Sequence, residues 1–115
     1  MSDIQELTEV INQFFDERDW KQFHNPKDMA ISLLLEATEV LEHFQWKNEK
    51  EVQEHIKAHY SDIKDEIADV AMNVFALAHD LDIDLKEAMM AKMAKNRLKY
   101  PIEKAKGNNA KYTQL

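Results

Sequence analysis

The sequence contains no cysteine, one glycine and two prolines in 115 residues. Without cysteine the chain forms neither disulfides nor thiolate metal sites, and this composition fits a reducing compartment. A β-rich fold needs many turns, so the scarcity of glycine and proline favours long helices. No apolar run approaches the roughly 20 residues that span a bilayer, and the acidic start lacks a signal-peptide pattern. We therefore expect a cytoplasmic all-α protein that does not enter a membrane.

The net charge of −7 is unevenly distributed along the chain. Residues 1–91 carry 21 acidic and 8 basic side chains, a net −13, whereas residues 92–115 carry 1 acidic and 7 basic, a net +6. The acidic body disfavours nucleic acid as a partner. An acidic body with a basic end could hold metal ions at one end of a ligand and phosphates at the other. A solubilising surface with a loose basic tail explains the same charges, and charge alone favours that simpler interpretation.

Helical periodicity predicts one domain over residues 1–115 with four main helices. We place them at about 2–18, 26–44, 60–81 and 85–99. Ser2, Asn25 and Asp84 are suitable N-caps for the first, second and fourth helices, and Ser61 or Asp62 for the third. We expect a polar connection at 45–58, with a short helix near 49–57, and an irregular basic tail at about 101–115.

The second and third helices are apolar around most of their circumference, which is typical of helices buried on most sides. Each has one narrow polar stripe. On a helical wheel the two stripes are Ser32, Glu36, Glu39 and His43, and Asp62, Glu66, Asp69 and Asn73. Two buried helices with one acidic stripe each should face one another across those stripes.

Carboxylates in a dry interior cost several kcal/mol each unless they are paired. Neither stripe contains a lysine or arginine, so a hard divalent cation such as Mg²⁺ is the natural counter-charge, and Mn²⁺ is a substitute. An E-x-x-E pair is usually a solvated helix face, and these residues alone leave the two interpretations about even. A di-iron bundle requires Glu-x-x-His motifs, and no glutamate here has histidine three residues later. His43, four residues after Glu39, is interpreted as a supporting or surface residue.

At these residues the chain resembles the MazG-like superfamily of all-α nucleoside triphosphate pyrophosphohydrolases. Its paired motifs correspond to Glu36-Ala-Thr-Glu39 and Glu66-Ile-Ala-Asp69. Residues 17–24, 39–47, 92–93, 96–101 and 111–113 are further similar to the small dCTP pyrophosphatase branch, so that the resemblance covers roughly residues 4–113. It implies a MazG-like helical bundle that assembles as a dimer or a dimer of dimers.

The resemblance implies Mg²⁺-dependent hydrolysis of a deoxynucleoside triphosphate, dCTP or a related one, to the monophosphate and pyrophosphate. Such an activity serves nucleotide-pool house-cleaning. The ligands and catalytic residues would be Glu36, Glu39, Glu66 and Asp69, with one carboxylate as the general base. Base contacts are expected from Trp20, His24, Trp46 and Asn73, although a lone tryptophan is usually core. Phosphate contacts are expected from Lys92, Asn96, Arg97, Lys99 and Tyr100, although a basic last turn also complements the helix dipole.

Two positions depart from the dCTP branch, which has histidine in place of Ile11 and tyrosine in place of Asn73. The base preference is therefore open, and dATP and other deoxynucleotides remain candidates. One alternative is a dUTP-selective all-α hydrolase, which shares the carboxylates. The other is a non-catalytic helical regulatory or interaction module, which would tolerate the loss of acidic positions that are all present here. The extent of apolar surface favours a homodimer or homotetramer.

Overall fold

A computed structural model describes residues 2–115 and confirms the all-α fold class. The helices are α1 (Asp3–Glu17), the 3₁₀ turn η1 (Lys21–Phe23), α2 (Pro26–Glu42), α3 (Glu49–Asp80), α4 (Leu85–Lys99), α5 (Ile102–Ala105) and the 3₁₀ turn η2 (Tyr112–Gln114). These described residues contain no β-strand. None of their helices combines the length and apolar character that crossing a membrane requires.

Local capping defines the starts of the first two long helices. Ser2 Oγ accepts from the Gln5 amide at 3.2 Å, and Gln5 Oε1 accepts from the Ser2 amide at 3.0 Å, which completes a capping box at α1. Asn25 Oδ1 accepts from the Asp28 amide at 2.9 Å, and Pro26 occupies the first turn of α2. Both predicted caps are therefore confirmed.

Helix α3 runs from Glu49 to Asp80, and its geometry breaks at His59, directly before the expected start at residue 60. The cap expected at Ser61 or Asp62 was wrong, because both residues lie inside the helix. Asn48 caps α3 through a capping box with Glu51, with the Glu51 amide donating to Asn48 Oδ1 at 2.9 Å. Residues 49–58 contain no glycine or proline, so the short helix expected near 49–57 continues into the next. The backbone departs from helical geometry at His59, with φ −124° and ψ 27°, and this kink marks the junction.

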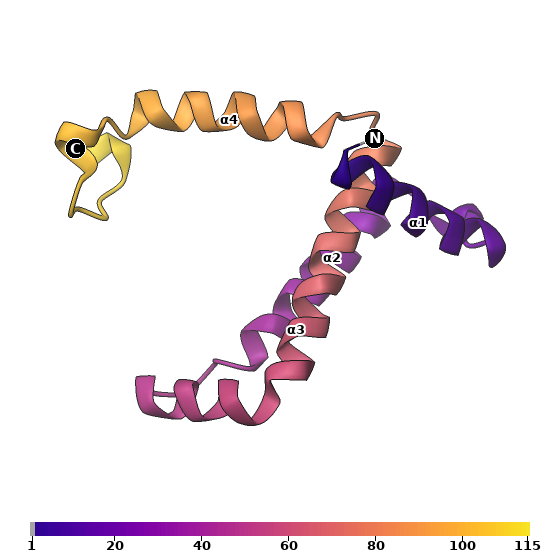
Figure 1. The fold of residues 1–115 in the computed structure, drawn as a ribbon, viewed down its shortest axis with the longest axis horizontal. Coiled ribbons are helices and arrows are strands. Elements are labelled where there is room, and N and C mark those ends of the chain that lie inside the picture. Colours follow the sequence, from indigo (N-terminus) through magenta and orange to yellow (C-terminus); the bar gives the residue numbers. More distant parts are fainter. Residues whose placement is uncertain (1) are drawn as a thin grey trace. The chain divides into compact units, whose positions relative to one another are not determined.

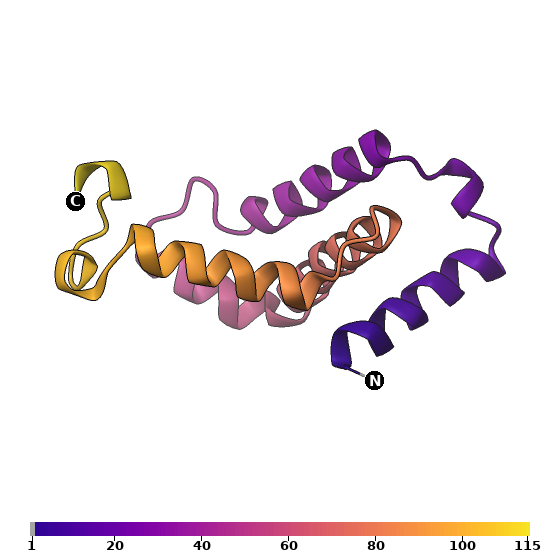
Figure 2. The ribbon, with the colours of Figure 1, turned by 90° about the horizontal axis from the view of Figure 1, so that it is seen from above.

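The chain forms two compact units, one ending at Asp82 and one beginning at Ile83. In the first, α2 and α3 lie side by side and α1 also packs on α3 (Figures 1 and 2). The core of this unit consists of Ile11, Met29 and Ala76, one residue from each helix, surrounded by Phe15, Phe75 and Leu77. All three long helices therefore meet at the end of α3.

The face of α2 that points away from Glu36 is not covered within the first unit. Leu34, Leu35 and Leu41 are 66%, 59% and 55% exposed, and Ile31 is 48% exposed. The expectation that α2 is buried on most sides is therefore not met within the first unit. The main helix contacts of this unit are those of α3 with α2 and with α1, so no further helix of the unit covers this face.

The second unit contains α4, α5 and η2. Asp84 caps α4 as expected, with Oδ1 accepting from the Glu87 amide at 3.0 Å. The helix ends at Lys99, and Pro101 follows in extended geometry. The segment expected to be an irregular tail contains the short helices α5 and η2, and the rings of Tyr100 and Tyr112 pack edge-to-face with centroids 6.1 Å apart.

Candidate active site

The two acidic stripes face each other across the α2–α3 interface. Toward one end of this interface His43 of α2's C-terminus contacts Glu66 of α3, and toward the other end Met29 packs with Ala76. The helices are therefore antiparallel, and Glu36 and Asp69 line a common cavity between these contacts. The helical wheel predicted this juxtaposition correctly.

Glu36 is the least satisfied carboxylate of the interface. Its Oε2 atom is buried and has no hydrogen-bond partner. Burial raises the pKa of Glu36, and the negative charges of Glu39, Asp69 and Glu66 raise it further. No ion pair within the described residues joins a lysine or arginine to these four carboxylates. The interface therefore has surplus negative charge and an unused oxygen ligand.

Oxygen-only donors with surplus negative charge match the chemistry of Mg²⁺ better than that of softer metals. Among the described residues no three histidine or acidic side chains converge closely enough to form a ready-made metal site. Glu66 contacts His43 through its Oε2 atom. The donor set fits the ion, while the assignment of the four ligands stays a prediction.

A cavity of about 550 Å³ opens beside the carboxylates. One wall is aromatic and comes from α1, η1 and the turns around it: Phe14, Phe15, Trp20, Phe23 and His24. The polar residues Ser32, Glu36, Asp69 and Asn73 line it from α2 and α3. This combination suits a flat aromatic ligand whose charged part lies toward the carboxylates.

Trp20 and His24, both predicted to contact a base, are held in the aromatic wall by local packing. The turn before Trp20 has Asp19 at φ 53°, and the Trp20 amide donates to the Phe15 carbonyl at 3.0 Å. Trp20 packs edge-to-face on Phe14 with ring centroids 5.6 Å apart, and His24 packs likewise on Phe15 at 4.6 Å. The indole is still 44% exposed, which leaves surface for a ligand.

The other two predicted base-binding residues lie in different surroundings. Asn73 lines the cavity, and its Nδ2 donates to the Asp69 carbonyl at 2.8 Å. Trp46 follows α2 at φ 65°, is 91% exposed and is not among the described residues that line the cavity. The structure thus brings three of the four predicted base contacts together.

Sequence reasoning assigned no ligand role to Val10, Phe14, Phe23 or Met72, all of which line the cavity. Val10, Ile11 and Phe14 share one face of α1 at i, i+1 and i+4 spacing. Of the three, Ile11 alone was singled out from the sequence, as a departure from the dCTP branch. Ile11 belongs to the core, where it is 8% exposed, and it also lines the cavity. An apolar stripe on a helix does not reveal whether a protein core or a ligand covers it.

The predicted phosphate-binding residues belong to the second unit. Lys92, Asn96, Arg97 and Lys99 lie on α4, and Tyr100 is its C-cap. The Lys99 ammonium lies 4.9 Å from the centroid of the Tyr112 ring, a cation–π contact. Their phosphate role stays a prediction.

Comparison with known proteins agrees with this geometry. The MazG-like family model matches residues 31–115. dCTP pyrophosphatase 1 of mouse and of human are each 34% identical over 114 residues, which cover 97% of this chain and 67% of the relative. A crystal structure of a pyrophosphatase from Archaeoglobus fulgidus superimposes with a TM-score of 0.81 and 35% identity, covering 88% of this chain and 94% of the other. The chain therefore belongs to the MazG-like family.

Proposed function

We propose that the protein hydrolyses deoxynucleoside triphosphates, dCTP or a related one, to the monophosphate and pyrophosphate. The observation that carries this proposal is the buried, unpartnered Glu36 oxygen among four carboxylates, next to an aromatic cavity. The relatives named dCTP pyrophosphatase support the same reaction. A water oxygen bonds to the α-phosphorus, the bond to the bridging oxygen breaks, and pyrophosphate leaves.

In this proposal Glu36, Glu39, Glu66 and Asp69 hold Mg²⁺, for which Mn²⁺ substitutes. The bound ion would supply Lewis-acid stabilisation of phosphate charge and a lower pKa for the attacking water. One of the four carboxylates accepts the water's proton as the general base.

The base would stack on Trp20, with His24 and Asn73 beside it, since all three line the cavity. Trp46 would contribute from its exposed position after α2. Lys92, Asn96, Arg97, Lys99 and Tyr100 would bind phosphates as cationic and hydrogen-bonding groups.

We further infer that the chain acts as one domain and as a homodimer or homotetramer. The family model spans residues 31–115 and so includes parts of both units, which supports a single domain. The uncovered apolar face of α2 supports self-association.

The direct test is a product assay over all dNTPs, dUTP and modified nucleotides, with Mg²⁺, with Mn²⁺ and with EDTA. We expect metal-dependent pyrophosphate release, highest for dCTP or a close analogue. A clear preference for dUTP would support the dUTP-selective alternative. Orthophosphate as the first product would exclude the proposed bond cleavage.

The ligand assignment is tested with Glu39→Gln and Asp69→Asn, which remove charge at nearly constant shape. Loss of a partner that merely orients a metal ligand typically costs 10–100-fold, so loss of a ligand should reduce turnover by more than about 100-fold. Far-UV circular dichroism should be unchanged. Glu42→Gln serves as the control, because Glu42 lies on α2, as Glu39 does. Full activity of both site variants would contradict the assignment.

A further inference from the structure

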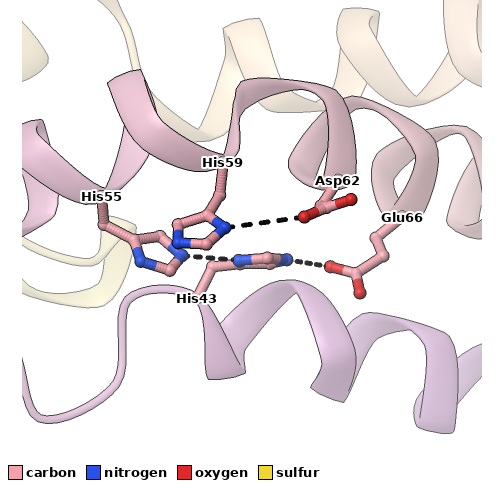
Figure 3. Close-up of polar contacts among 5 residues, drawn as sticks. All are labelled: His43, His55, His59, Asp62 and Glu66. Carbon is pink, nitrogen blue, oxygen red and sulfur yellow. Dashed lines mark hydrogen bonds and ion pairs between the residues drawn. The ribbon is translucent and has the colours of Figure 1, made fainter.

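A row of three histidines adjoins the carboxylates at the C-terminal end of α2. His43 contacts the Oε2 atom of Glu66 through Nε2, and its Nδ1 lies 2.7 Å from Nε2 of His55 (Figure 3). The side chains of His43 and Glu66 are only 13% and 28% exposed. His43 therefore lies between a candidate metal ligand and a second histidine from the N-terminal part of α3.

The contacts at both ring nitrogens fix the orientation of His43. A carboxylate only accepts, so Nε2 of His43 donates to Glu66. The contact between Nδ1 of His43 and Nε2 of His55 holds the His43 ring from its other side. Burial lowers the pKa of His55, and electrostatic interaction with His59 and Lys47 lowers it further.

His55 is itself held in place. Its ring stacks on His59 with centroids 4.4 Å apart and an interplanar angle of 28°. Nδ1 of His59 lies 3.6 Å from Oδ2 of Asp62 (Figure 3). These contacts cross the kink at His59, so the two parts of α3 jointly orient the ring that orients His43.

We propose that His43, itself oriented by His55, is a positioning residue that restricts the Glu66 side chain and so supports metal binding by that carboxylate. The inference rests on the proposed function, since it assumes that Glu66 binds a metal ion. The contact occupies one carboxylate oxygen, Oε2. Such outer hydrogen bonds restrict a ligand before the metal arrives.

The test is calorimetric titration of the full chain with Mg²⁺ and with Mn²⁺ in the absence of nucleotide. His43→Leu removes both hydrogen bonds and should weaken metal binding by about 10–100-fold. His43→Gln keeps a donor and should recover part of the affinity. The matched control is His79→Leu, which changes an exposed histidine on α3, the helix that carries Glu66, and should bind metal like the wild type.

The role of His55 is tested by a double-mutant cycle. His55→Leu should weaken binding less than His43→Leu, and the double variant should be no weaker than His43→Leu alone, because His55 acts through His43. Additive losses would overturn that part of the inference. Circular dichroism in EDTA verifies folding, and His43→Gln decides the question where His43→Leu does not fold.

Other outcomes separate this inference from the proposed function. Wild-type affinity in His43→Leu overturns the positioning role alone. Tighter metal binding in that variant also overturns it, because His43 would then compete with the ion for Glu66. If Glu66→Gln binds metal as the wild type does, both the ligand assignment and the inference fail.

Discussion

At the scale of single residues, Glu36 combines burial with three acidic neighbours, and both raise its pKa. A carboxyl whose pKa is higher in the folded state contributes stability that is present at acid pH and lost as pH rises through that folded pKa. In the metal-free protein Glu36 therefore opposes folding at neutral pH. An ion bound there would remove this penalty.

Glu36→Gln should consequently stabilise the metal-free protein at neutral pH, and the gain should shrink as pH falls toward the ordinary carboxylate range. Urea unfolding of both proteins in EDTA, between about pH 5 and pH 8, measures this difference. Glu49→Gln is a control, because Glu49 lies exposed in the first turn of α3. A gain in stability that does not change with pH would contradict the explanation.

Trp20 lies in the aromatic wall of the cavity with 44% of its surface still exposed. A base that stacks on an aromatic side chain gains about 1–3 kcal/mol, so Trp20→Ala should raise KM for the preferred dNTP roughly tenfold. Trp20→Phe keeps an aromatic face and should lose less. Steady-state kinetics tests both variants, and an unchanged KM in Trp20→Ala would place the base elsewhere.

At the scale of elements, the N-terminal part of α3 depends on its capping box. Asn48 and Glu51 satisfy backbone donors of the first turn reciprocally. This segment carries His55, whose ring contacts His43. Its local stability therefore affects the orientation of the histidine row.

Asn48→Ala should destabilise the protein by about 1 kcal/mol, because one backbone donor loses its partner. The loss should be concentrated in residues 49–58, where amide hydrogen exchange should accelerate most. Asn48→Asp keeps the acceptor and is the matched control. Uniform acceleration over the whole of α3 would show that the kink at His59 does not separate two locally stable parts.

At the scale of the whole molecule, the exposed leucines on α2 have the character of an interface. Leu34 lies on the side opposite to Glu36 and Leu35 flanks that side, with 66% and 59% exposure. A continuous apolar helix face is unusual on a monomer and typical of subunit contacts. Self-association would cover this face and leave the carboxylate side free.

Leu34→Glu should shift the assembly toward monomers, because it places a charge in the apolar contact. Sedimentation analysis across a concentration series measures the mass. Gln53→Glu, an exposed position on α3, adds the same charge outside this face and should not change the mass. A wild-type protein that is monomeric at all concentrations would contradict the prediction.

The sequence predicted the helices best where a cap or a breaker is local. Ser2, Asn25 and Asp84 were identified as N-caps because a capping side chain bonds to a backbone amide only a few residues away. The start of α3 was misplaced because Ser61 and Asp62 also resemble caps. The continuation of a helix through such residues depends on packing and not on local preference.

The sequence by itself determined the all-α class and the two carboxylate stripes. Helical spacing alone places Glu36 and Glu39 on one face of α2, and Glu66 and Asp69 on one face of α3. Only the tertiary structure decided which of those oxygens is buried without a partner, and that His43 lies against Glu66 with His55 behind it. It also decided that Trp20 and Asn73 share a cavity from which Trp46 is absent among the described residues. The physical reason is that periodicity fixes directions within one helix, whereas contacts between helices depend on how their side chains pack together.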